Sequence, residues 1–151
     1  MPVSVASVRA LPGLAAPLAA IVRAALALEG RRAGEVAVVL ADDAALRELN
    51  RRWRGLDRAT DVLSFGYDDG AGERVDGDIA ISLERARAQA RRFRVAPGRE
   101  LARLAVHGAL HLAGLDHERP TSRRVMRARE DRVLRGAGEI VAELERRVEA
   151  G

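Results

Sequence analysis

Apolar and polar positions along this chain follow the two periods of regular secondary structure. The stretch EVAVVLA at residues 35–41 is short, apolar and rich in valine, which predicts a buried strand. Further strands are expected at residues 3–8, 61–67 and 78–82. Residues 68–77 hold three glycines and four acidic residues, so a turn-rich connection is expected there.

Apolar residues at helical spacing fill most of the remaining chain. Leu14, Leu18 and Ile21 share one face of a helix expected over residues 14–29. Pro97-Gly98 is expected to break the chain. One expected helix begins after the N-cap Asp42 and carries Leu46, Leu49 and Trp53, and another runs from the N-cap Ser82 through an inward-facing Phe93. Further helices are expected over residues 99–113, over residues 120–134 and in the tail after Gly138.

The order of these elements indicates the fold class. Strands and helices alternate early, helices dominate late, and no repeat, linker or low-complexity tract divides the chain. We therefore expect a single α+β domain over residues 1–151, with a mixed sheet of about four strands packed by five to six helices.

Composition narrows the chemistry. Of 151 residues 48% are hydrophobic and 32% charged, as in a folded globular protein. All 26 basic side chains are arginine, and the net charge of +4 permits an anionic partner without requiring one. Cysteine is absent, which excludes disulfides, thiol nucleophiles and thiolate zinc sites.

The N-terminal apolar segment does not suggest export. Pro12, Gly13 and Pro17 interrupt it, and Arg23 precedes the only candidate cleavage site. No stretch approaches the ~20 apolar residues of a membrane span. A cytoplasmic protein with no membrane association is the expectation.

The three histidines of the chain lie in one segment, HGALHLAGLDH, as His107, His111 and His117. His107 and His111 are four residues apart, so both rings leave the same helix face. Gly114 can adopt the left-handed conformation that ends a helix, which lets the chain turn back and bring His117 to the same point. Three imidazoles with a fourth position left for water predict a catalytic metal site at the end of the 99–113 helix. Water bound to that metal becomes a nucleophile.

Two other interpretations of these histidines remain open. In the first interpretation they are ordinary surface or core histidines. The helix is apolar nearly all round, and buried histidines need polar partners, which disfavours this interpretation. In the other they belong to a metalloprotease motif, HExxHxxGxxH, in which the general base is a glutamate. Position 108 is glycine here, and Glu100 is too distant to replace the base, which disfavours peptide hydrolysis.

A second segment places four arginines within eight residues, at positions 51, 52, 54 and 58, around Trp53. Arginine forks suit phosphate, and a tryptophan can stack on a base. The alternative is a solvated helix end in which Trp53 covers the core.

Together, residues 49–65, Gly77-Asp78-Ile79 and residues 107–117 resemble the YbeY family of rRNA-maturation endoribonucleases. The family patterns are LN…(aromatic)RG.D.PTDVLSFP, GDI and HGxLHLxGYDH. The length and the order of the motifs match throughout, so the resemblance spans essentially the whole chain. Ala59, Gly66 and Leu115 depart from the usual residues, and none of them is a metal ligand.

The resemblance implies a zinc-dependent, single-strand-specific endoribonuclease acting in 16S rRNA 3′-end maturation and ribosome quality control. It implies His107, His111 and His117 as metal ligands and Arg54 as the arginine associated with activity. Its partners would be single-stranded RNA, precursor small-subunit rRNA, the ribosomal small subunit and assembly factors, with no DNA. Asp61, Ser64 and Asp78 match family positions without an assigned role.

Several choices stay open at the level of sequence. One Zn²⁺ per chain is expected, but other divalent transition metals such as Ni²⁺ suit three imidazoles too. Asp116 is either a hydrogen-bond partner of the site or a turn former. The seven arginines of residues 119–135 track RNA or form a solvated face. A non-catalytic ribosome-assembly factor with a structural metal, or a metallohydrolase of peptides or amides, is the alternative function.

Overall fold

The computed structural model of the protein describes residues 3–7, 13–67, 72–115 and 120–148. Within these residues, four strands form one mixed sheet, in the spatial order β1 (Val3–Ser7), β2 (Arg32–Ala41), β4 (Arg74–Ser82) and β3 (Val62–Gly66). The first three are parallel, and β3 runs antiparallel to β4. The predicted α+β class and the mixed sheet are confirmed.

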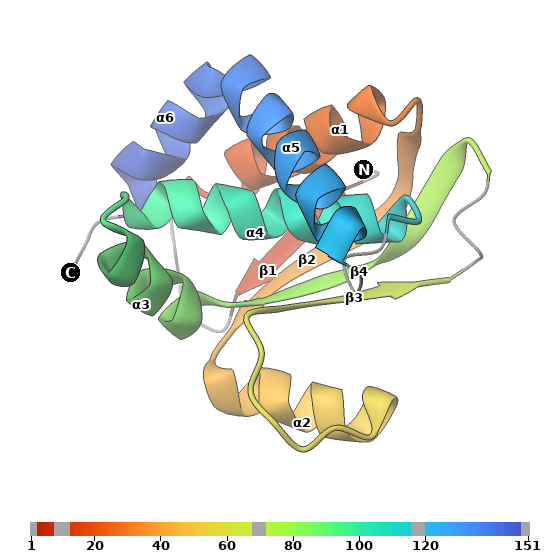
Figure 1. Ribbon diagram of the computed structural model, residues 1–151, viewed down its shortest axis with the longest axis vertical. Helices are drawn as coiled ribbons and strands as arrows, with labels where there is room; N and C mark the ends of the chain where they lie inside the picture. The colour runs from red at the N-terminus through yellow and green to blue at the C-terminus, as the bar shows by residue number, and fades with distance from the viewer. Residues whose placement is uncertain (1–2, 8–12, 68–71, 116–119, 149–151) are drawn as a thin grey trace.

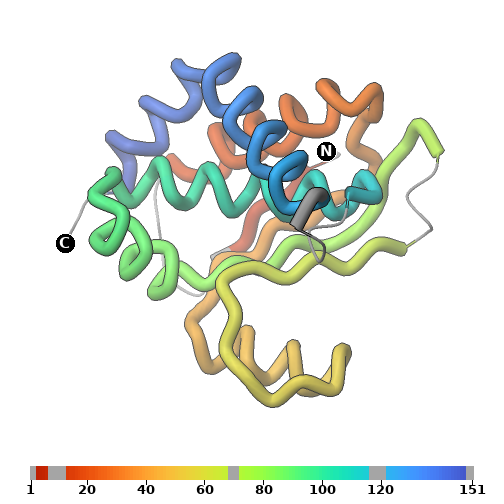
Figure 2. The backbone as a smooth tube through the Cα atoms, in the orientation of Figure 1, coloured from red at the N-terminus to blue at the C-terminus, as the bar shows by residue number. Residues whose placement is uncertain are grey.

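Six helices within the described residues surround the sheet. They are α1 (Ala15–Leu28), α2 (Asp43–Arg54), α3 (Leu83–Phe93), α4 (Pro97–Leu112), α5 (Pro120–Gly136) and α6 (Gly138–Arg147). Helix α4 crosses one face, with α1, α5 and α6 packed around it, and α2 lies on the opposite face (Figure 1). From α2 the chain loops back beneath the sheet to enter β3 (Figure 2).

The main hydrophobic core lies between the sheet and the helices around α4. Helix α4 is buried almost all round, as its sequence predicts, and supplies Leu101, Leu104, Val106 and Leu110 at 1% exposure or less. A much smaller cluster, Ala41, Leu46 and Ala80, lies under α2 on the other face. Helix α2 therefore depends on few apolar contacts, while α4 is anchored throughout its length.

Most of the predicted elements are confirmed, and both predicted N-caps are present. The Asp42 carboxylate accepts from the Ala45 amide at 2.8 Å, and the Ser82 hydroxyl accepts from the Arg85 amide at 3.1 Å. The predicted break between two helices is present, since α3 ends at Phe93, but α4 begins at Pro97 instead of Arg99. Proline fits the first helical position, which needs no amide donor.

The predicted turn-rich connection over residues 68–77 is wrong at its end, since β4 begins at Arg74. Strand β4 is central, and Gly77 pairs with Val36 on one side and Gly66 on the other. Backbone pairing on both sides requires no particular side chain, so it prevails over the local turn preference of glycine and aspartate.

Two aromatic side chains are not where the helical pattern predicts them. Phe93 is 55% exposed instead of inward, with its ring 5.6 Å from the Arg92 guanidinium. Trp53 is 68% exposed, so it does not cover the core. Each is in the last turn of its helix, α3 or α2, where the helix has passed the surface that it packs against.

Candidate active site

His107 and His111 lie one turn apart near the C-terminal end of α4, with their ring centroids 4.8 Å apart. Both are half-buried on a helix that is otherwise mostly buried. Gly114, beyond the end of α4, has a φ of 100°, the positive value predicted for it. The predicted third ligand, His117, and Asp116 lie outside the described residues.

Glycine 108 allows α4 to approach the sheet closely at this point. A Cβ at this position would lie 2.5 Å from Cγ2 of Ile79, and the Ser64 hydroxyl donates to the Gly108 carbonyl at 2.9 Å. Position 108 therefore faces β3 and β4, away from the imidazoles. A glutamate there would collide with the sheet, so the general base of the long metalloprotease motif has no place in this packing.

A groove of about 420 Å³ opens beside the two imidazoles. It separates the end of α4 from the C-terminal turn of α2 and from the loop that leads into β3. Its lining is Asn50, Arg54, Leu56, Arg58, Thr60, Asp61, Val62, Leu63, Ser64, His107, His111 and Leu115. Two segments of the chain that the sequence singled out thus form opposite walls of one groove.

Arg54 is the cationic side chain fixed on the α2 wall. Its Nη2 donates to the Ser64 carbonyl at 2.7 Å, and its guanidinium carbon is 5.4 Å from the centre of the Phe65 ring. No carboxylate of the described residues forms an ion pair with Arg54, whereas Arg51 pairs with Glu48 at 2.6 Å. A charged fork held at one nitrogen can present its other donors to an anion in the groove.

The loop behind Arg54 is fixed by Asn50, which is 3% exposed. Its side-chain amide donates to the Arg58 carbonyl at 3.0 Å, and its backbone carbonyl accepts from the Leu56 amide at 3.2 Å. These bonds join the last turn of α2 to the loop, so Arg54 and Arg58 line the groove together.

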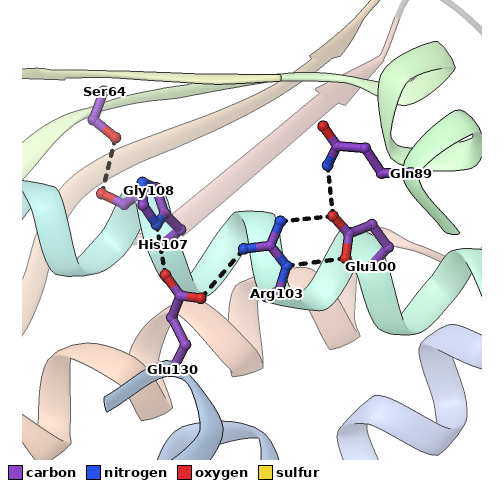
Figure 3. Close-up of polar contacts among 7 residues, drawn as sticks. All are labelled: Ser64, Gln89, Glu100, Arg103, His107, Gly108 and Glu130. Carbon is purple, nitrogen blue, oxygen red and sulfur yellow. Dashed lines mark hydrogen bonds and ion pairs between the residues drawn. The ribbon is translucent and has the colours of Figure 1, made fainter. Parts of the chain in front are cut away.

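Glu130 is a residue of this site that sequence reasoning missed. It extends from α5, and its Oε2 lies 2.6 Å from Nδ1 of His107 (Figure 3). In the sequence, Glu130 lies within the arginine-rich stretch of residues 119–135, where a carboxylate attracts no notice. The signal is its spacing, because it falls four residues after the buried Met126 and four before the buried Leu134, where a core side chain is expected.

A chain of polar contacts continues from Glu130 away from the groove (Figure 3). Arg103 donates to Glu130 at 3.3 Å and makes two bonds to Glu100, at 2.9 and 2.7 Å. Gln89 donates to Glu100 at 2.6 Å. The hydrogen bond to Glu100 and the nearby charge of Glu130 raise the pKa of Arg103 further, so the guanidinium stays charged.

The other sequence candidates divide into two groups. Asp61 and Ser64 line the groove. Asp78 does not; it accepts a hydrogen bond from Tyr67, which raises the pKa of that phenol. On α5, most of the described arginines are exposed, and Arg129 pairs with Glu29 at 2.7 Å.

The chain matches a known protein family over most of its length. Residues 13–138 match the family model described as Endoribonuclease YbeY. The Endoribonuclease YbeY of Anaeromyxobacter sp. is 46% identical over 121 residues, covering 79% of this chain and 62% of the relative. That of Moorella thermoacetica is 44% identical over 129 residues, covering 78% of this chain and 83% of the relative. This chain thus spans less than two thirds of the Anaeromyxobacter protein.

A solved structure has the same fold. The solution structure of TM1509 from Thermotoga maritima matches with a TM-score of 0.67 and 26% identity, over 99% of this chain and 98% of that one. The named relatives are endoribonucleases, a class of hydrolases that cut RNA within the strand. Within that class, this chain belongs to the YbeY family of endoribonucleases.

Proposed function

We propose that this endoribonuclease cleaves single-stranded RNA with a divalent metal held by His107, His111 and His117. Its proposed substrate is precursor small-subunit rRNA, in 16S rRNA 3′-end maturation and ribosome quality control. The observation that carries the proposal is the groove lined by Arg54 on one side and by His107 and His111 on the other. Membership of the YbeY family supports the reaction class.

The donor set fits a divalent transition metal. Two imidazoles lie one turn apart, and a buried carboxylate lies within hydrogen-bond distance of Nδ1 of His107, as is usual for metal-binding histidines. Within the described ranges these donors do not by themselves make a three-ligand cluster. One Zn²⁺ per chain is proposed, with Ni²⁺ as a possible substitute. When bound, the metal supplies the Lewis acidity that lowers the pKa of water toward ~7.

The protein side chains supply binding and orientation. Arg54 holds the scissile phosphate and offsets the negative charge that grows on it during attack. The Ser64 carbonyl fixes one edge of the guanidinium, so the fork is preorganised before RNA arrives. Arg58, on the same wall of the groove, contacts a neighbouring phosphate.

The cellular setting is part of the proposal. We propose the cytoplasm as its location and the ribosomal small subunit and assembly factors as its partners, with no part for DNA. No helix in the described residues is long and apolar enough to cross a membrane.

Metal dependence on a single-stranded substrate tests this function. The full chain is stripped with a chelator, reloaded with Zn²⁺ or Ni²⁺, and given labelled single-stranded RNA or the same sequence as a duplex. We expect cleavage of the single strand, loss on stripping and recovery on reloading. Cleavage that survives stripping, or that is equal on the duplex, contradicts the proposal.

The alternatives give different results in the same experiment. A protein that binds metal and ribosomal particles but cuts no RNA is an assembly factor with a structural metal. For the second alternative, hydrolysis of peptides or amides, the structure already gives an argument against it: position 108 faces the sheet, where no carboxylate fits.

A further inference from the structure

We propose that Glu130 is a positioning residue that fixes the tautomer and orientation of His107 for metal binding. This inference rests on the metal site proposed above. It goes further by assigning a role to a side chain on α5, a helix that supplies none of the described residues that line the groove.

Glu130 is a carboxylate buried on a helix face that is otherwise apolar. Its side chain is 4% exposed, on the apolar face of α5 that also buries Met126 and Val133. Burying a carboxylate is unfavourable unless charged or hydrogen-bonding partners compensate. An apolar residue at position 130 would complete the stripe without that cost, so stability alone does not explain a glutamate there.

The contact with His107 has a direct chemical consequence. Neutral imidazole carries one N–H, and an ionised carboxylate can only accept a hydrogen bond. With Oε2 of Glu130 2.6 Å away, the proton of neutral His107 belongs on Nδ1, which leaves the lone pair on Nε2. His107 also lines the groove, so Nε2 is the ring nitrogen that would bind the proposed metal.

The contacts behind Glu130 hold that carboxylate in place. Arg103 bonds to Glu130 and to Glu100, which is 2% exposed and accepts a further bond from Gln89. Arg103 thus joins two buried carboxylates, and of these Glu130 is the one within 2.6 Å of Nδ1 of His107. The bond to Arg103 keeps Glu130 from turning away from the ring.

The chain offers a matched control. Glu100→Gln removes a carboxylate that is as deeply buried as Glu130 and bonded to the same Arg103, but that does not contact His107. Glu130→Gln makes the same chemical change next to the ring. Glu130→Ala removes the hydrogen-bond acceptor entirely, and the more conservative glutamine variant remains if the alanine variant does not fold.

Two measurements on the full-length protein test the inference, each with thermal unfolding as the check on folding. The first is the His107 tautomer in metal-free protein, read from the ¹⁵N shifts of the ring nitrogens at a pH about two units above the ordinary histidine pKa of ~6.5. We expect Nδ1–H in the wild type and in Glu100→Gln, and a mixture of tautomers in Glu130→Ala. Retention of Nδ1–H in Glu130→Ala overturns the proposal.

The second measurement is Zn²⁺ affinity by competition with a chromophoric chelator. We expect both Glu130 variants to bind about 10–100-fold more weakly, and Glu100→Gln to bind as the wild type does. Equal losses in the Glu100 and Glu130 variants overturn the proposal, because they indicate a general effect of buried charge. A wild type that binds no Zn²⁺ contradicts the proposed function instead, and the tautomer still decides the role of Glu130.

Discussion

Arg54 and Arg52 are neighbours on α2 with different surroundings. Arg54 lines the groove and is tied to Ser64, whereas Arg52 is exposed and does not line it. Arg54→Ala should lower the rate of RNA cleavage by about 10²-fold, because the charge growing on the phosphate loses its donor. Stability should hardly change, since the side chain is exposed.

Arg52→Ala is the matched control for that prediction. It removes the same charge from the same helical turn, so a general loss of attraction for RNA affects both variants. Cleavage rates on labelled single-stranded RNA should separate them. Equal rates for the two variants would show that Arg54 has no special part in the reaction.

Gly108 is the residue on which the close packing of α4 and the sheet depends. Gly108→Ala should destabilise the fold by about 1–3 kcal/mol, because the new methyl group overlaps Ile79 and its neighbours. Gly136→Ala is the control, since a Cβ at the end of α5 meets nothing within 4 Å and should be neutral or stabilising. Urea unfolding measures both, and equal stability of the two variants would contradict this packing.

Helix α2 is the element that carries Arg54, and its N-terminus is bonded to α3. Asp43 accepts from Ser82 at 2.7 Å and from Arg85 at 3.0 Å, while Glu84 accepts from the Asp43 amide at 2.7 Å. With only a small apolar cluster beneath it, α2 depends on these polar contacts for its position. The groove is therefore sensitive to bonds that are made at the opposite end of the helix.

The stability contributed by Asp43 should depend on pH. Its hydrogen bond with Arg85 lowers the pKa of Asp43 below the ordinary 3.8. A lowered pKa in the folded state means that the contribution is present above 3.8 and is lost as the pH falls through the lower folded value. Asp43→Asn should thus lower the free energy of unfolding by about 0.5–1 kcal/mol at neutral pH, a small effect because the ion pair is partly exposed. The difference between the variant and the wild type should shrink as the pH falls.

Urea unfolding across pH measures this difference. Asp57→Asn is the control, because Asp57 pairs with Arg47 on the exposed surface and should contribute less. A deficit of Asp43→Asn that stays constant as the pH falls below 3.8 would show that the ion pair is not its cause.

Helices and strands were largely predictable from the sequence, for local reasons. Apolar spacing and the caps Asp42 and Ser82 act within a few residues, and the structure confirms them. Pairing across the fold was not predictable in this way. Glu130 meets His107 from 23 residues away, and only the packing of α5 on α4 brings them together.

The site shows the same division at the scale of the whole molecule. The spacing of His107 and His111 on one helix face is a local property, so sequence alone predicts that they share a direction. That Arg54 reaches the same groove depends on α2 lying on the far face of the sheet and on the loop that returns to β3 (Figure 2). In the sequence, only the family resemblance associated Arg54 with the histidine site, because local periodicity says nothing about contacts between distant segments.

The proposed contacts with RNA phosphates make binding depend on salt concentration. Arg54 and Arg58 both line the groove, and the net charge of the chain is +4. The logarithm of the affinity for single-stranded RNA should fall linearly with the logarithm of the salt concentration, with a slope of about −0.7 for each phosphate contacted. A binding titration at several salt concentrations measures the slope, and Arg58→Ala should make it shallower by roughly that amount.

The central claim is that the histidines of α4 form an RNA-cleaving centre. The most direct test compares wild type and His111→Ala, prepared identically and given Zn²⁺, on a labelled single-stranded RNA. We predict rapid internal cleavage by the wild type and none by the variant, with both proteins equally folded. Equal cleavage by the two proteins would contradict the claim, because the activity would then not require the metal site.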